Sequence, residues 1–284
     1  MAIKMDGKAL AEKMRAQIST ETAELCRKPT LAVILVGDDP ASQVYVRNKE
    51  KDCVECGILS QSYRLPEETS EQQLLELIDV LNGNPLVDGI LVQLPLPQHI
   101  SQEKIIHAID PEKDVDAFHP VNVGKIVTGE TGFLPCTPAG VMELLREYKI
   151  PVEGKNCVVV GRSNIVGKPM ALLLLRENGT VTVCHSKTKD LAEVTRRADI
   201  LICAVGKVNM ITADMVKEGA VVIDVAMNRN EEGKLCGDCD FAAVAEKASY
   251  ITPVPGGVGP MTRLVLMKNT LTAAKNHIGS VKEP

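Results

Sequence analysis

The feature that most constrains the fold is a regular alternation of short apolar runs with amphipathic helical stretches. In the second half of the chain, apolar runs at 158–160, 180–184, 200–204 and 220–225 are interspersed with helical patterns at 166–176 and 191–197. Short apolar runs are typical of strands buried on both faces, and helical connections are typical of parallel strands. The order therefore predicts an α/β fold with a doubly wound parallel sheet of the Rossmann type.

The first half of the chain follows the same logic over a smaller span. We predict strands at 31–36, 60–64 and 88–93, and helical patterns at 41–56 and 71–81 lie between them. We also expect helices at 1–15, at 137–148 and from about residue 261 to 275. Together these patterns predict two domains: an N-terminal α/β substrate domain over 1–138, joined by the C-terminal helix at 261–284, and a Rossmann-type domain over 139–260.

Composition excludes several classes of protein. A chain of 284 residues with 45% hydrophobic residues is long enough and apolar enough to fold around its own cores. The net charge of -5 and the lack of a basic block argue against nucleic-acid binding. No apolar run is long enough to span a membrane, and residues 1–15 lack the apolar stretch of a signal peptide. We therefore expect a cytoplasmic protein.

The nine cysteines are best interpreted as buried free thiols, because most of them lie inside apolar runs. Two C-x-x-C pairs, Cys53/Cys56 and Cys236/Cys239, could form a four-cysteine zinc site. The pairs lie far apart in the sequence, however, and the first falls in a helical pattern. We expect no bound metal.

A candidate cofactor site follows the strand at 158–160. The segment from Gly161 to Gly167 leads directly into a helix, and such turns let backbone N–H groups approach a pyrophosphate. Ser163 replaces the middle glycine of the G-x-G-x-x-G pattern, so a purely structural turn remains an alternative. The next strand ends in His185-Ser186-Lys187-Thr188, without the carboxylate that holds the ribose 2′-hydroxyl of NAD. Arg162 and Ser186 could instead bind a 2′-phosphate, which favours NADP, although both could be ordinary solvated loop residues.

Candidate substrate residues come mainly from the first half. Tyr45 and Lys49 share one helix face, where a ring could stack on a planar heterocycle and an amine could transfer protons; by spacing alone, a surface pair is the commoner case. Gln93 closes a buried strand before Leu94-Pro95-Leu96-Pro97. Asp116 is either an Asx-turn residue or a carboxylate that faces a guanidine-like ligand edge.

The segment from Pro253 to Pro260 is glycine-rich yet apolar, and this predicts a fixed loop whose backbone approaches a ligand. We interpret His119 and His185 as loop histidines without a catalytic partner.

Taken together and in order, these motifs resemble the bifunctional methylenetetrahydrofolate dehydrogenase/methenyltetrahydrofolate cyclohydrolase family. The motifs are Tyr45-x-x-x-Lys49, Val92–Pro97, Asp114–Asp116, Pro135–Pro138, Gly161–Pro169, His185–Thr188 and Pro253–Thr262. The resemblance implies oxidation of 5,10-methylenetetrahydrofolate with NADP, followed by hydrolysis of the methenyl product to 10-formyltetrahydrofolate. It also implies a homodimer in one-carbon metabolism and purine biosynthesis, two domains joined by long helices, and an active site between the domains.

The same resemblance assigns roles by position. Lys49 resembles the catalytic lysine, Gln93 the residue that orients and tunes it, Tyr45 the group that packs on the folate, and Asp116 the pterin-binding carboxylate. Val92, Leu94, Pro255, Gly256 and Gly257 complete the expected folate site. Gly161, Arg162, Ser163, Ser186 and Met227 form the expected cofactor site.

The sequence departs from the family pattern at a few positions. Ala117 stands where the family has glycine, Ala226 and Met227 stand where it has Gly-Ile, and Arg263 stands where a small apolar residue is usual. Ala226 puts cofactor affinity in question, because the loop that contains it approaches the cofactor. Two other functions remain open: a dehydrogenase of another small metabolite, of the shikimate type, and a non-catalytic NADP-sensing module.

Overall fold

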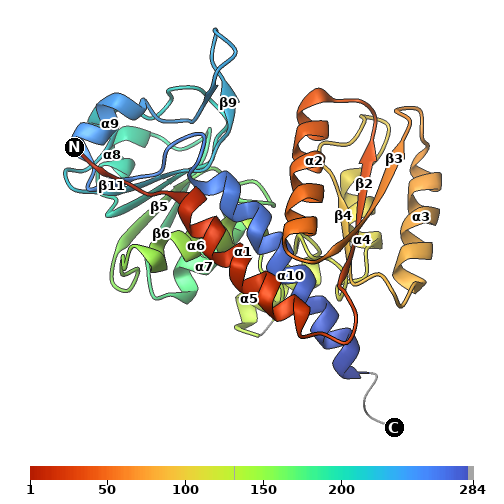
Figure 1. Cartoon of the computed structure of the whole chain (residues 1–284). Helices are drawn as coiled ribbons and strands as arrows, with labels where there is room; N and C mark the ends of the chain where they lie inside the picture. Colours follow the sequence, from red (N-terminus) through yellow and green to blue (C-terminus); the bar gives the residue numbers. More distant parts are fainter. Residues whose placement is uncertain (131, 281–284) are drawn as a thin grey trace. The chain divides into compact units, whose positions relative to one another are not determined.

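The computed structural model describes residues 1–130 and 132–280, which divide into two compact units (Figure 1). Unit 1 comprises residues 1–12, 126–130 and 135–262, and unit 2 comprises the described residues of 13–125, 131–134 and 263–284. Helix α1 (Gly7–Ala23) and helix α10 (Val258–Ser280) each contribute residues to both units. Residues 281–284 of the expected C-terminal helix lie outside the described residues.

Unit 1 is built on a six-stranded sheet in which every pairing is parallel. Its spatial order is β1 (Ile3–Lys4), β11 (Tyr250–Ile251), β8 (Val221–Asp224), β7 (Ile200–Cys203), β5 (Asn156–Val160) and β6 (Thr180–Cys184). The chain goes from β5 outward to β6 and then returns to β7 on the other side of β5. The order therefore reverses between β5 and β7, where doubly wound sheets bind ligands at the carboxyl ends of the strands.

Helices and a hairpin complete unit 1. They are α6 (Cys136–Glu147), α7 (Gly167–Arg176), α8 (Leu191–Thr195), the 3₁₀ helix η1 (Ala213–Met215), the strands β9 (Asn228–Arg229) and β10 (Leu235–Cys236) and helix α9 (Phe241–Lys247). Strands β7 and β8 are buried along their whole lengths, which explains why all of their residues except Asp224 are apolar. The predicted α/β class and doubly wound parallel sheet are confirmed.

The predicted helix at 1–15 is wrong at its start. Residues Ile3 and Lys4 form the edge strand β1, which pairs in parallel with Tyr250 and Ile251, and α1 begins only at Gly7. The pairing partner lies almost the whole chain away, so no local pattern could indicate this strand.

Unit 2 contains a parallel three-stranded sheet with the order β3 (Leu59–Leu65), β2 (Thr30–Val36) and β4 (Gly89–Val92). Helices α2 (Pro40–Glu55) and α3 (Glu71–Gly83) lie on opposite sides of this sheet (Figure 1). Helix α4 (Gln102–Ala108) packs with α3 and the sheet in one apolar core, and helix α5 (Pro120–Thr128) follows. Strands β2 and β4 are buried along their whole lengths. They form the rigid part of unit 2 that positions helix α2 and the residues that follow β4.

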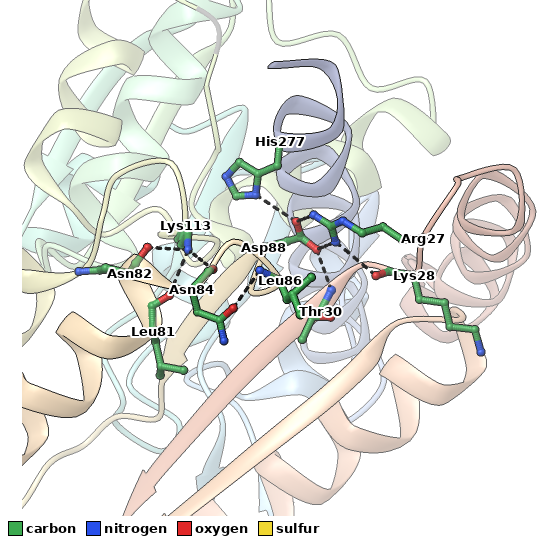
Figure 2. Close-up of polar contacts among 10 residues, drawn as sticks. All are labelled: Arg27, Lys28, Thr30, Leu81, Asn82, Asn84, Leu86, Asp88, Lys113 and His277. Atoms are coloured by element: carbon green, nitrogen blue, oxygen red, sulfur yellow. Dashed lines mark hydrogen bonds and ion pairs between the residues drawn. The ribbon is translucent and has the colours of Figure 1, made fainter. Parts of the chain in front are cut away.

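A buried carboxylate anchors the start of β4 (Figure 2). Asp88 accepts hydrogen bonds from both terminal nitrogens of Arg27 at 2.6 Å and from the N–H of Thr30 at 2.9 Å, and it lies 3.0 Å from His277 Nδ1 on α10. Burial raises the pKa of Asp88, but the bonds from Arg27, His277 and Thr30 outweigh burial and leave this pKa lowered. The ionised carboxylate therefore ties β2, β4 and α10 together.

A buried lysine closes the end of α3 in the same region (Figure 2). Lys113 Nζ donates to the carbonyl oxygens of Leu81, Asn82 and Asn84 at 3.0, 2.7 and 2.7 Å. A cation at this position satisfies carbonyl groups that have no partner inside the helix.

Within the described residues, no helix combines the length and apolar character needed to cross a bilayer.

Candidate functional site

Helix α2 presents Tyr45 and Lys49 one turn apart. Asp39 caps this helix with a carboxylate that accepts a hydrogen bond from the N–H of Ser42 at 2.7 Å, and Pro40 is the first helical residue. Lys49 is only 8% exposed, which excludes the surface-pair interpretation that spacing alone had favoured. A buried amine needs a polar partner.

Gln93 supplies that partner from the end of β4. Lys49 Nζ donates to Gln93 Oε1 at 3.0 Å, and Gln93 Nε2 donates to the carbonyl oxygen of Leu94 at 2.7 Å. The N–H of Gln93 donates to the carbonyl oxygen of Ile34 at 2.8 Å, which extends the β2–β4 pairing by one residue. Both ends of the Gln93 amide are thus fixed, with its oxygen toward Lys49. The structure brings these two predicted residues together, and their catalytic roles stay predictions.

An ionic cluster that sequence reasoning did not find lies next to this pair. Asp52, three residues after Lys49 on α2, binds Arg15 Nη2 at 2.9 Å and Arg263 Nη1 at 3.0 Å. The Asp52 side chain is 2% exposed. Burial raises the pKa of the half-buried Tyr45, and the charge of Arg263 opposes that shift. The unusual Arg263 is therefore the counter-ion of a buried carboxylate beside the Tyr45–Lys49 turn.

The two aspartates of the turn at 114–116 have different environments. Asp114 is buried and accepts from the N–H of His119 at 2.8 Å and from Asn122 Nδ2 at 2.9 Å. Burial raises the pKa of Asp114. Asp116 is half-buried and lines a small cavity of about 10 Å³ with Leu94. Asp114 is therefore the turn-forming residue, and the folate-binding role of Asp116 stays a prediction.

Three further residues of the expected folate site, Val92, Gly256 and Gly257, lie in different surroundings. The Val92 side chain packs in the core of unit 2. Gly256 has φ +108°, and Gly257 donates its N–H to the carbonyl oxygen of Pro253 at 2.8 Å. A Cβ on Gly7 would lie 1.8 Å from the Gly257 oxygen, so the loop rests directly on the start of α1. This loop belongs to unit 1, whereas Tyr45, Lys49, Gln93 and Asp116 belong to unit 2.

The turn after β5 is closed by tight backbone packing. A Cβ on Gly161 would lie 2.3 Å from the carbonyl oxygen of Ala204, and one on Gly167 would lie 2.2 Å from the oxygen of Gly161. Ser163 Oγ accepts from the N–H groups of Val166 and Gly167 at 3.1 and 3.3 Å. The glycines are thus required by the turn itself, and the Ser163 hydroxyl can still donate its proton to a ligand.

Arg162 and Ser186 emerge at the same edge of the sheet. Val160 and Cys184, the last residues of β5 and β6, pair with each other. Arg162 and Ser186 are exposed, and each lies two residues after the end of its strand. Beyond β6, the N–H of Lys187 donates to His185 Nδ1 at 3.1 Å, which shapes the loop that carries Ser186. A guanidinium and a hydroxyl at neighbouring strand ends form a suitable pair for a phosphate monoester.

Met227, the remaining expected cofactor residue, follows β8 and is 39% exposed. A Cβ on Gly259 would lie 3.5 Å from Met227 Cε, so this methionine lies against the start of α10.

Seven of the nine cysteines are buried free thiols, whereas Cys26 is exposed and Cys236 is partly exposed. Burial raises the pKa values of Cys53 and Cys56 to about 12, which keeps both protonated. The described part of the chain contains no group of three or more His, Cys, Asp or Glu side chains arranged to hold a metal ion.

Comparisons with known proteins cover almost the whole chain. The model for the catalytic domain of tetrahydrofolate dehydrogenase/cyclohydrolase matches residues 5–116, and that for its NAD(P)-binding domain matches residues 135–278. The bifunctional protein FolD of Campylobacter hominis is 59% identical over 281 residues, which cover 98% of this chain and 99% of the relative.

Two solved structures agree with these matches. The bifunctional enzyme FolD, a methylenetetrahydrofolate dehydrogenase/cyclohydrolase from Campylobacter jejuni, is 54% identical with a TM-score of 0.96, covering 97% of this chain and 99% of its own. The Trypanosoma brucei methylenetetrahydrofolate dehydrogenase-cyclohydrolase, solved with NADP and an inhibitor, is 39% identical with a TM-score of 0.93 and covers 99% of both chains.

Proposed function

This chain belongs to the tetrahydrofolate dehydrogenase/cyclohydrolase family, and we infer from that membership that it is an enzyme with both activities. It oxidises 5,10-methylenetetrahydrofolate to 5,10-methenyltetrahydrofolate with NADP and then hydrolyses the product to 10-formyltetrahydrofolate. The observation that carries the chemistry is the hydrogen bond between buried Lys49 and Gln93. Family membership argues against a shikimate-type dehydrogenase.

The residues of unit 1 suit NADP. The tight turn at 161–167 precedes α7, where backbone N–H groups and the helix dipole favour a pyrophosphate. We propose that Arg162 and Ser186 bind the 2′-phosphate, because no carboxylate lies at the end of β6 to repel it. When bound, NADP accepts a hydride. The protein's task in this step is to align donor and acceptor, since the substrate's own nitrogen lone pairs stabilise the cation that forms.

The residues of unit 2 suit the folate and the hydrolytic step. We propose that Asp116 pairs with the amino group and ring N–H of the pterin edge, and that Tyr45 packs against the folate. When water attacks the methenyl carbon, protons must move as the ring opens. Lys49 is the group that transfers them, and Gln93 holds its ammonium nitrogen in one direction.

We also propose that the protein acts as a cytoplasmic homodimer in one-carbon metabolism that serves purine biosynthesis. The resemblance to the family supports the location, the oligomeric state and the metabolic role. Light scattering of the purified protein tests the oligomeric state, and a mass equal to one chain at micromolar concentration would contradict the dimer.

Two assays on the purified wild-type protein test the function. The first adds 5,10-methylenetetrahydrofolate and NADP and follows the absorbance of NADPH. The second adds methenyltetrahydrofolate alone and follows the loss of its absorbance. We expect turnover in both, no reaction with shikimate, and a clear preference for NADP over NAD. Cofactor binding without turnover in either assay would favour a non-catalytic NADP-sensing module.

A further inference from the structure

A buried carboxylate that belongs to neither the expected folate site nor the expected cofactor site organises the loop after β7. Asp238 is 0% exposed, and its two oxygens accept three consecutive backbone N–H groups. These come from Val205 at 2.6 Å, Gly206 at 3.2 Å and Lys207 at 2.7 Å. Three peptide groups that point at one carboxylate fix the backbone of residues 205–207 in a single shape.

The same carboxylate also reaches the segment after β8. Asn228 Nδ2 donates to Asp238 Oδ1 at 3.0 Å. Residue 228 directly follows the exposed Met227. One side chain therefore joins the chain beyond the carboxyl ends of two adjacent strands, β7 and β8.

Asp238 is itself held in place by a second buried carboxylate. Asp224, the last residue of β8, accepts from the N–H of Asp238 at 2.9 Å and from the N–H of Cys239 at 2.8 Å. A Cβ on Gly237 would lie 2.0 Å from Asp224 Oδ2, so only glycine fits before Asp238. The position of Asp238 thus depends on the sheet and not on the tip of the β9–β10 hairpin.

These loops lie where a cofactor must bind. The turn after β5 packs on Ala204 at the end of β7, so residues 205–207 follow directly from the switch point of the sheet. Ligands of doubly wound sheets bind there, at the carboxyl ends of the strands. A loop with a fixed backbone offers its peptide groups to the ligand without first losing conformational freedom.

We propose that Asp238 is a positioning residue for NADP, which holds residues 205–207 and Asn228 in the conformation that binds the cofactor. The proposal rests on the proposed function only for the identity of the ligand. Asp238 touches no ligand itself. Its negative charge is essential, because four donors converge on it and a neutral amide would turn an N–H group toward at least one of them.

The two activities of one protein separate this role from a general structural one. In Asp238→Asn, we expect the Kd for NADPH, measured by fluorescence titration, to rise at least about tenfold, since hydrogen bonds to a charged group are lost. The KM for NADP in the dehydrogenase reaction should rise in parallel. Hydrolysis of added methenyltetrahydrofolate without NADP should stay within about twofold of wild type, because unit 2 supplies its proton-transfer groups.

Asp240→Asn is the matched control. Asp240 lies two residues further along, and its carboxylate caps α9 by accepting from the N–H of Ala243 at 3.3 Å. We expect this variant to leave NADPH binding and both activities at wild-type levels. An equal effect of both substitutions on NADPH binding would overturn the proposal.

A second variant keeps the test decisive if Asp238→Asn does not fold. Asn228→Ala removes one of the four donors and leaves the carboxylate buried with its three backbone bonds. It should weaken NADPH binding by about threefold to tenfold, with an unchanged circular dichroism spectrum. Wild-type NADPH affinity in Asn228→Ala or in folded Asp238→Asn, or an equal loss of both activities, would refute the positioning role. A wild-type protein that binds NADPH but turns nothing over would refute the proposed function and leave the binding test of Asp238 intact.

Discussion

The cluster of Asp52, Arg15 and Arg263 allows a quantitative test of how unit 2 is held together. Asp52 is 2% exposed, whereas the side chains of Arg15 and Arg263 are 15% and 22% exposed. Arg15 has a second partner in Glu55, which lies 2.9 Å from its Nε. The buried carboxylate of Asp52 therefore depends on the two arginines more than the partly exposed arginines depend on Asp52. The perturbation is a double-mutant cycle of Asp52→Ala and Arg263→Met.

The structure gives the magnitudes. Loss of one partner of a buried ion pair typically costs 3–5 kcal/mol, and the partial exposure of both arginines brings the expected cost of Asp52→Ala to about 3 kcal/mol. Arg263→Met leaves Asp52 bonded to Arg15, and the lost ion pair between a buried carboxylate and a partly exposed guanidinium should cost about 1–2 kcal/mol. Once Asp52 is absent, removing Arg263 should cost almost nothing, so the double variant should fall short of the sum by about 1–2 kcal/mol.

The assay is equilibrium unfolding in urea, followed by circular dichroism because the chain contains no tryptophan. Lys51→Met is the control, since the exposed pair of Lys51 with Glu55, 3.6 Å apart on the same helix, should contribute at most about 0.5 kcal/mol. Additive effects within about 0.5 kcal/mol, or a larger cost for Arg263→Met than for Asp52→Ala, would refute this account of Arg263.

Three further predictions concern single positions. Ala117→Gly should raise the free energy of unfolding by about 0.5–1 kcal/mol in the same urea assay, because Ala117 has φ +59°, where a Cβ is unfavourable; a loss of stability would contradict this. Arg162→Ala should raise the KM for NADP at least about tenfold and leave that for NAD nearly unchanged, since a bond to the 2′-phosphate is lost; equal effects on both cofactors would rule out this role. Asp116→Ala should raise the folate KM in both reactions by a similar factor, and an unchanged KM in both would show that Asp116 only shapes the turn.

Much of the fold could be predicted because most strands of four or more residues are rich in apolar and β-branched residues. Strand β6 was predicted at its observed bounds, and the other strands of four or more residues differ by at most two residues at either end. Helices α4, α5 and α9 were not predicted, since seven to nine residues give too little periodicity. The two-residue strands β1 and β11 exist only through pairing with distant segments. The predicted domain boundaries stay predictions.

The candidate site could be predicted only in part. Spacing placed Tyr45 and Lys49 on one face, but the contact with Gln93 depends on the pairing of β2 with β4, which no local pattern shows. Asp238 gave no signal of its own, because it lies inside the Cys236-x-x-Cys239 pair that had suggested a metal. Its importance follows from four donors that come from distant segments, and only the structure brings these together.

The central claim is that Lys49 transfers the proton in hydrolysis and is not needed for hydride transfer. Lys49→Gln keeps much of the side-chain volume and a hydrogen-bonding tip, but it cannot exchange the proton. A positioned acid or base typically accelerates such a step by about 10²–10⁴-fold. The measurement follows methenyltetrahydrofolate over time after NADP is added to enzyme and 5,10-methylenetetrahydrofolate. We predict that the variant accumulates methenyltetrahydrofolate while the wild type consumes it. Equal loss of both activities, or hydrolysis at the wild-type rate, would contradict the role of Lys49.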